Sequence, residues 1–387
     1  MLCAGLAADA AISDPPNSSS SRLLHLPMKT RMLGLRRRNL VGLDIDASAV
    51  RMVQLRKDSS GYAVVKAVVA DIAPWGNDPQ LHRLHTTQAI LQGLSSAAIR
   101  SRYAVCGLRG PEVVVRDFEF PALTPEEIAG AVELEVSQIC PFLAEESTFD
   151  YQMTSNNGKR TRGFWVAATN DLIHNTRQLA SEAGLHCALV DVAGLALLNL
   201  LGSENQEQQT EGSEPASPLR TAVLNLGDAC VSIAIADPAG RPFVRDIGSG
   251  VATESCPSLV ASQLAGDGSF CAEDGWALRN HDHGATNDSL VEDVTTTLRY
   301  YAAQNGSARV DRLLVCGGVA TEESVELLRT KLTIEVESWN PLLNGRFRVE
   351  DSGSKQTEDD DPSSTLCNLE RYGPSLAVAA GLAMRSI

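Results

Sequence analysis

Two stretches of this sequence share one pattern, and together they restrict the fold more than any other feature. Residues 40–71 give a strand, a turn, a second strand, a break and a third strand, which is the pattern of an antiparallel meander. Residues 221–247 repeat that order, with Gly227 in the first turn. Because both halves begin with a meander, the sequence indicates an internal duplication and predicts an α/β protein with two lobes.

The composition agrees with a globular chain and disfavours several classes of protein. The 387 residues are 43% hydrophobic, which is enough for two or three domains. The net charge of −15 repels a nucleic acid backbone, so we expect no nucleic acid partner. No uninterrupted apolar run is long enough to span a bilayer, so we expect no direct membrane insertion. The cytoplasm is the expected location.

Cysteine and histidine usage gives little sign of a disulfide framework or a metal centre. The nine cysteines are scattered, without a CxxC spacing, and several lie in apolar runs. This distribution indicates a reducing compartment. The tract His281-Asp282-His283 superficially resembles a metal site, but adjacent loop residues without a third ligand are typical of a polar loop. We predict no metal site.

Changes in composition divide the chain into segments. Residues 1–37 are expected to be a disordered extension, and their start lacks the basic region of a signal peptide. Residues 202–219 are rich in Glu, Gln and Ser and are predicted to be a flexible linker. This linker separates a first lobe at 38–201 from a second lobe at 220–387. Within the second lobe, the polar and aperiodic residues 249–290 are predicted to be a reduced subdomain.

The most informative local segment is residues 103–169, a predicted subdomain inserted in the first lobe. Thr124 and Glu127 have the spacing of a capping box, with a proline at the first helical position. Two strands follow this helix around a hairpin signal at residues 156–158. The predicted order is therefore strand, helix, strand, strand. The apolar face of the helix is predicted to be Ile128, Val132, Val136 and Ile139.

The end of this helix and the residues after it carry a family resemblance. The residues concerned are Ile139, Pro141, Phe142, Glu145, Glu146, Asp150 and Tyr151. In this order, they resemble the PilM family of type IV pilus assembly and competence proteins, within the actin-like ATPase superfamily. The resemblance extends from Leu40 to Arg385. It implies a two-lobed actin-like (ribonuclease H-like, duplicated) fold with an inserted SHS2-type subdomain, which FtsA shares.

The resemblance also implies where a nucleotide would bind. In actin-like folds the two hairpins present backbone N–H groups to the phosphates of ATP. The first hairpin here is Asp44-Ile45-Asp46-Ala47-Ser48, where the family has Asp-Ile-Gly-Ser-Ser. The second is Asn225-Leu226-Gly227-Asp228, where the family begins with Asp-x-Gly. The implied site consists of Asp44, Asp46, Ala47, Ser48, Asn225, Gly227, Asp228, Gly317 and Gly318.

These departures from the family pattern bear on ATP and Mg²⁺. Asp46 and Asp228 introduce negative charge where the phosphates would lie. Asn225 replaces an acid that would organise Mg²⁺, and Val319 replaces a third glycine of the adenosine motif. We therefore predict that binding of ATP and Mg²⁺ is weak or lost. No catalytic residue and no hydrolysis are predicted.

The resemblance implies a cytoplasmic assembly protein of a type IV pilus or type II secretion-like machine. Such a protein docks the N-terminal tail of a PilN-like inner-membrane protein, is held at the membrane by that partner, and works with other pilus assembly components. We expect the tail to bind in a groove beside residues 103–169, where an open sheet edge could pair with an extended peptide.

Two other functions are compatible with parts of the pattern. A sugar or metabolite kinase of the same superfamily needs a catalytic base near the cleft, whereas Asp44 and Asp46 lie on a phosphate hairpin. An FtsA-like cell-division protein needs a C-terminal amphipathic membrane helix, whereas the sequence ends at Ile387 directly after a predicted core helix. The kinase is the alternative to the assembly function.

Overall fold

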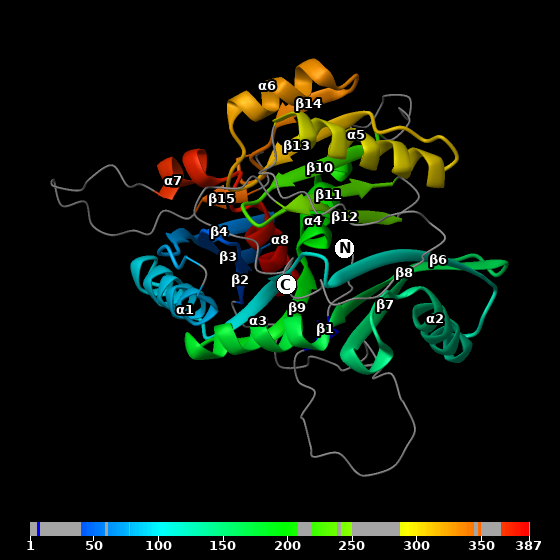
Figure 1. Ribbon diagram of the computed structural model, residues 1–387, viewed down its shortest axis with the longest axis horizontal. Coiled ribbons are helices and arrows are strands. Elements are labelled where there is room, and N and C mark those ends of the chain that lie inside the picture. Colours follow the sequence, from blue (N-terminus) through cyan, green and yellow to red (C-terminus); the bar gives the residue numbers. More distant parts are fainter. Residues whose placement is uncertain are drawn as a thin grey trace, which may run out of the picture.

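Two sheets with matching strand orders form the body of the protein, and a third, smaller sheet lies beside them (Figure 1). The computed structural model describes residues 6–7, 40–58, 61–76, 78–207, 219–237, 241–249, 287–343, 347–349 and 365–386.

The first sheet has the strand order β1-β9-β5-β2-β3-β4-β15. Strands β2, β3 and β4 form the antiparallel meander that the sequence predicts, and β5 and β9 extend the sheet in parallel beside β2. The strands are β1 (Leu6–Ala7), β2 (Val41–Ile45), β3 (Ala49–Asp58), β4 (Gly61–Asp71), β5 (Tyr103–Leu108), β9 (His186–Val192) and β15 (Phe347–Val349).

The second sheet has the order β12-β11-β10-β13-β14. Its meander is β10-β11-β12, and β13 and β14 again follow in parallel beside the first strand. The strands are β10 (Thr221–Leu226), β11 (Cys230–Ala236), β12 (Pro242–Ser249), β13 (Arg312–Cys316) and β14 (Glu335–Ser338).

The two sheets match strand for strand. The order β4-β3-β2-β5-β9 in the first corresponds to β12-β11-β10-β13-β14 in the second, with the same antiparallel and parallel pairings. The predicted duplication and the two-lobed α/β fold are therefore confirmed.

Helices cover both outer faces of the body and fill the space between the sheets (Figure 1). α1 and α3 pack on the outer face of the first sheet, and α5 and α6 pack on the second. α4 and α8 lie between the two sheets, where α8 contacts β2 and α4 contacts β11. The helices are α1 (Pro79–Ser96), α3 (Asn170–Glu182), α4 (Ala193–Glu207), α5 (Asn287–Gln304), α6 (Glu322–Lys331), α7 (Thr365–Tyr372) and α8 (Ala377–Ala383), which a short 3-10 turn (Met384–Ser386) follows.

Small residues let α8 approach its neighbours closely. A Cβ on Gly42 of β2 would overlap the carbonyl oxygen of Ala379, and one on Gly381 would overlap that of Ala196 in α4. One continuous cluster of buried residues includes α4, α8 and the facing strands of both sheets. The largest core of the described chain is therefore the contact between the lobes.

The third sheet and α2 form an inserted unit at residues 113–169, which lies at the lower right of Figure 1. Thr124 and Glu127 form the predicted capping box, with both reciprocal hydrogen bonds present. The observed order is the predicted strand, helix, strand, strand; its assignment as an SHS2-type subdomain stays a prediction. The elements are β6 (Val113–Pro121), α2 (Pro125–Ile139), a 3-10 turn (Ala144–Glu146), β7 (Ser147–Asn156) and β8 (Arg160–Thr169), with the sheet order β6-β8-β7.

The inserted unit has its own apolar core. Ile128, Val132 and Val136 are buried on the sheet together with Trp165, as the helical spacing predicts. Ile139, in contrast, is 52% exposed. It is the last residue of α2, so no further turn of helix holds its side chain against the sheet, and its assignment to the buried face is wrong.

Several predicted boundaries differ from the structure. The inserted unit begins after the predicted residue 103, because β5 (Tyr103–Leu108) pairs with β2 and β9 of the first sheet, and the predicted subdomain at 249–290 overlaps the end of β12 and the start of α5. α4 continues through residues 202–207, which the sequence analysis places in the linker; Glu and Gln have good helix propensity and extend the helix. Leu6 and Ala7, within the predicted disordered extension, form β1, because they add to the exposed edge of β9. The remaining domain limits stay predictions.

Four of the sequence predictions fall wholly or partly outside the described residues. These are the rest of the disordered extension apart from 6–7, the linker from 208 to 218, the reduced subdomain from 250 to 286, and the His281–His283 tract. Among the described residues, no cluster of His, Cys, Asp or Glu has the arrangement of a metal site, and the described cysteines are free thiols. No described helix combines the length and the apolar character that crossing a bilayer requires.

Candidate functional site

The first hairpin of each lobe reaches the boundary between the lobes, and the two hairpins meet there. The turn at residues 46–48 connects β2 to β3, and the turn at 227–229 connects β10 to β11. The first turn is closed by the backbone N–H of Asp46, which donates to the carbonyl of Ala49 at 3.0 Å. We call the two turns, together with Asp44, Arg51 and Arg109, the hairpin junction.

The Asp46 carboxylate is the centre of the hairpin junction. The backbone N–H of Asp228 donates to Oδ2 at 3.2 Å, and that of Ala229 donates to Oδ1 at 3.1 Å. The N–H of Ala47, in its own turn, donates to Oδ1 at 3.0 Å. The carboxylate of one lobe therefore accepts converging backbone donors from the other lobe.

Two arginines neutralise the carboxylates of the first hairpin. Arg51 Nη1 lies 3.2 Å from Asp46 Oδ2, and Arg109 Nη1 lies 3.4 Å from the same oxygen. Arg109 also forms an ion pair with Asp44. The side chains of Arg51, Arg109, Asp44 and Asp46 are all less than 10% exposed. Charges this deeply buried need such partners, because each loses its hydration.

Further contacts join the lobes around this centre. The hydroxyl of Ser48, in the first lobe, donates to the carboxylate of Asp228 in the second lobe. The N–H of Asp228 donates in return to Asp46 of the first lobe. The N–H of Gly110 donates to Asp246 Oδ2 at 2.6 Å. Burial raises the pKa of the Asp246 carboxyl, and burial also lowers the pKa of the Arg109 guanidinium, although nearby acids oppose that shift. The charged centre of the junction is thus buried, whereas Ala47 and Ser48 are partly exposed and Ala229 is exposed.

The other predicted nucleotide residues lie around the same centre. Gly227 leaves room for Asp46, since a Cβ there would be 2.9 Å from Asp46 Oδ2. Gly317 has φ +118, a conformation that L side chains rarely adopt, and a Cβ on Gly318 would overlap the Arg51 guanidinium. Asn225 is buried, and its Oδ1 lies 3.9 Å from the Cys316 thiol. The structure therefore brings together the residues that the sequence selects.

Three participants are missed by the sequence analysis: Arg51, Arg109 and Asp246. Arg51 is the third residue of β3, between Val50 and Met52, and an arginine between apolar residues of a strand needs a buried partner. Arg109 directly follows the carboxyl end of β5, where parallel strands of a sheet present functional residues. Both positions carry a usable signal. Asp246 carries none, because its partner is 136 residues away along the chain.

The observed contacts do not fit a bound phosphate group. The N–H donors of the second hairpin, which would face a phosphate, are directed at the Asp46 carboxylate. The carboxylate of Asp228 lies beside them and would repel a further anion. A phosphate could reach these donors only by displacing Asp46 from both arginines.

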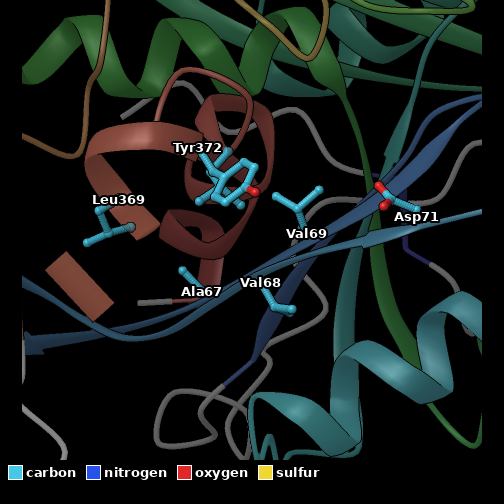
Figure 2. Close-up of a pocket in the computed structure, with 7 residues that line it drawn as sticks. Ala67, Val68, Val69, Asp71, Leu369 and Tyr372 are labelled. Atoms are coloured by element: carbon cyan, nitrogen blue, oxygen red, sulfur yellow. The ribbon is translucent and has the colours of Figure 1, made fainter. Parts of the chain in front are cut away.

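A pocket of about 170 Å³ is present elsewhere, between β4 and the start of the C-terminal helices (Figure 2). None of its lining residues belongs to the predicted nucleotide set. Its volume is below the roughly 300–1,000 Å³ of typical small-molecule sites. We assign it no ligand. It is lined by Ala67, Val68, Val69, Asp71, Leu369, Tyr372 and Leu376.

The duplicated strand order, with a helix from each lobe packed between the sheets, defines an actin-like ATPase fold. The sequence model of one family, described as type IV pilus assembly protein PilM, matches residues 42–251, more than half of the 387 residues. The chain belongs to this family.

One solved structure supports the fold, and two others align with lower TM-scores. A PilM–PilN type IV pilus biogenesis complex aligns with a TM-score of 0.66 and 20% identity, over 90% of this chain and 99% of that one. Ethanolamine utilization protein EutJ from Carboxydothermus hydrogenoformans aligns at a TM-score of 0.42 and 10% identity, over 89% of each chain. The cytoplasmic domain of EpsL, from the type II secretion system of Vibrio cholerae, aligns at 0.41 and 9%, over 79% and 98%.

Proposed function

We propose that this PilM-family protein docks the extended cytoplasmic tail of a PilN-like inner-membrane protein. The docking site is the groove between the edge of β9 and strand β7 of the inserted unit. The protein lies in the cytoplasm and is held at the inner membrane by this partner, within a type IV pilus or type II secretion-like machine. The PilM–PilN complex among the similar structures supports the class of partner.

The observation that carries this proposal is the pairing at the edge of β9. Leu6 and Ala7 add there as the short antiparallel strand β1, with Leu6 opposite Val190 and Ala7 opposite Leu189. β1 also contacts β7, so the added strand runs between the first sheet and the inserted unit (Figure 1). A sheet edge that pairs with two residues of extended chain has the backbone groups to pair with a longer peptide.

The inserted unit also exposes apolar side chains next to its edge strand. Leu143 is 66% exposed and Ile139 is 52% exposed, and both come shortly before β7 begins. β7 is itself an edge of the small sheet, since β8 occupies the centre. Exposed apolar residues near an edge strand are typical of a surface that binds a partly apolar peptide.

The hairpin junction supports an assembly role over the alternative of a kinase. A catalytic base must face a second substrate, but Asp44 and Asp46 are buried in ion pairs with Arg109 and Arg51. We therefore propose a scaffold that carries out no hydrolysis of its own.

A labelled peptide with the N-terminal residues of the neighbouring PilN-like protein tests the docking. We expect saturable binding by fluorescence anisotropy, and tighter binding when residues 1–10 are removed, because Leu6 and Ala7 no longer compete for the edge of β9. Ala7→Pro in the full chain should have the same effect as the deletion, since proline lacks the backbone N–H. Leu219→Ser, which changes an exposed apolar residue directly before the second lobe, is the matched control and should bind as the unmodified protein does.

Hydrogen exchange then locates the peptide. In the variant that lacks residues 1–10, bound peptide should protect amides of β9 and β7. The docking site is wrong if the peptide binds but leaves both strands unprotected, or if it protects only the second lobe.

A further inference from the structure

We propose that Asp46 replaces the phosphate of a nucleotide, so that the protein holds its two lobes together with a carboxylate of its own. The hairpin junction is then a self-filled anion site rather than a ligand site. This inference depends on the contacts of Asp46 and not on the docking function proposed above.

The donor set around Asp46 is that of an anion site. Two backbone N–H groups of the second hairpin and two guanidinium groups point at one carboxylate. Converging backbone N–H groups of a turn bind anions, and guanidinium groups form the strongest hydrogen bonds to carboxylate and phosphate. The same kinds of donor also bind phosphate groups in proteins.

An aspartate that only closes its own turn would have different contacts. It would accept from its own hairpin, as Asp46 does from Ala47. Asp46, however, also accepts from two residues of the other lobe, the nearer of them 182 positions away along the chain. It is 4% exposed, whereas turn aspartates normally face water. The burial of Asp46 therefore follows from its hydrogen bonds to the other lobe.

Removing this carboxylate would leave an identifiable defect. In Asp46→Gly, Arg51 loses the carboxylate with which it pairs at 3.2 Å, and Arg109 keeps only its pair with Asp44. The N–H groups of Asp228 and Ala229 lose their acceptor at the same time. The variant then has a buried positive charge and unpaired donors at one point, and an added anion can satisfy both.

Anion rescue of thermal stability is the test. Melting temperatures are measured for the full chain and for Asp46→Gly in chloride, inorganic phosphate and Mg-ATP at constant ionic strength. We expect the unmodified protein to melt at the same temperature in all three. Asp46→Gly should melt several degrees lower in chloride and recover in phosphate, because an anion that binds only the folded state stabilises it. Recovery in Mg-ATP beyond that in phosphate would show that the site also accepts a nucleotide.

A second buried ion pair provides the matched control. Asp191 and Arg385 are 0% and 5% exposed and form a hydrogen-bonded pair. Asp191 also accepts from the N–H of the next residue, Val192, at 2.8 Å. Asp191→Gly should also lower the melting temperature, but phosphate should not restore it. This control separates an anion site from the general effect of salt on an unpaired arginine.

Two outcomes overturn the proposal. One is that phosphate or Mg-ATP raises the melting temperature of the unmodified protein by as much as it raises the melting temperature of Asp46→Gly. The other is a lack of recovery of Asp46→Gly in phosphate. If the glycine variant does not fold in chloride, its refolding yields in phosphate and in chloride are compared instead, and a higher yield in phosphate supports the proposal. Asp46→Asn keeps one acceptor oxygen without the charge and provides a milder variant for the melting experiment.

Discussion

The hairpin junction and the inserted unit differ in where their ion pairs lie. At the junction, carboxylates, guanidinium groups and backbone donors from both lobes are buried against one another. In the inserted unit, the core cluster is apolar, Ser147, Asp150 and Thr161 are the buried polar residues, and the ion pair between Glu119 and Arg162 lies at the surface, with the arginine 39% exposed. The junction therefore depends on long-range pairing of charges, whereas the unit depends on the packing of a small apolar core.

This difference separates a region whose central charges are paired within the protein from one that has exposed apolar side chains near an edge strand. The junction leaves its converging donors with an acceptor inside the protein. The inserted unit leaves β7 at a sheet edge, with Leu143 exposed nearby. The donors at the hairpins are thus occupied within the protein, which agrees with the proposal that the partner binds beside β7 instead.

The largest expected effect is at the junction. Arg109→Met leaves the buried Asp44 carboxylate without its ion-pair partner, and breaking one side of a buried pair costs about 3–5 kcal/mol. Urea unfolding measures this change. Arg162→Met, in the surface ion pair of the inserted unit, is the control and should cost about 0–1 kcal/mol. Equal losses for the two variants would remove the distinction between the regions.

The next effect tests the core of the inserted unit. Ile128 is 1% exposed, and Ile128→Ala should lower the free energy of unfolding by about 2–5 kcal/mol, because it leaves a cavity against the small sheet. Leu134→Ala on the same helix removes a side chain that is 59% exposed and should change stability by no more than about 0.5 kcal/mol. A large loss for Leu134→Ala would mean that this face of α2 is covered in solution.

A smaller effect is expected at the start of α2. Thr124→Ala removes the side-chain acceptor for the N–H of Glu127, and loss of such a cap costs about 1 kcal/mol. Thr124→Ser keeps the hydroxyl and should retain most of the stability. Circular dichroism during urea unfolding compares the two variants, and equal stability of Ala and Ser at this position would show that the capping box contributes nothing.

The smallest effect is expected from the surface ion pairs. Hydrogen bonds from Arg162 and Arg160 lower the pKa of Glu119 below its ordinary value of 4.5. A lowered folded-state pKa means that this stabilisation is fully present above about pH 4.5 and is lost as the pH falls through the folded-state pKa. Glu119→Gln should therefore be slightly less stable than the unmodified protein at pH 7, and the difference should narrow at acid pH. A difference in the urea midpoint that grows on acidification would contradict this assignment.

Local patterns were enough to predict much of the fold. The meanders, the capping box at Thr124 and the hairpin at residues 156–158 depend on neighbours in the sequence, and each is observed where it was predicted. Elements whose pairing is distant were missed. β15 pairs with β4 of the other lobe, and α7 contacts that same strand. Neither has a strong local signal, because each is short and is stabilised by contacts with β4.

At the hairpins too, the residues could be recognised from the sequence, but their distant contacts could not. The acids at Asp46 and Asp228 were recognised from the sequence as departures from the family's hairpins, together with the charge conflict that they create for a phosphate. The sequence could not indicate that Asp46 accepts the N–H groups of Asp228 and Ala229, or that Arg51 and Arg109 neutralise it.

By itself, the sequence determined the duplicated strand pattern, the order of the inserted unit and the family, because period, turn chemistry and capping are local properties of the chain. The tertiary structure alone decided which polar groups meet. The first lobe places Arg51, Arg109 and Asp46 on different elements. The two backbone N–H groups that donate to Asp46 from Asp228 and Ala229 lie on the second lobe. Their partnership exists only once α4 and α8 have packed the lobes together, since burial then removes water and requires every charge at the boundary to find a partner within the protein.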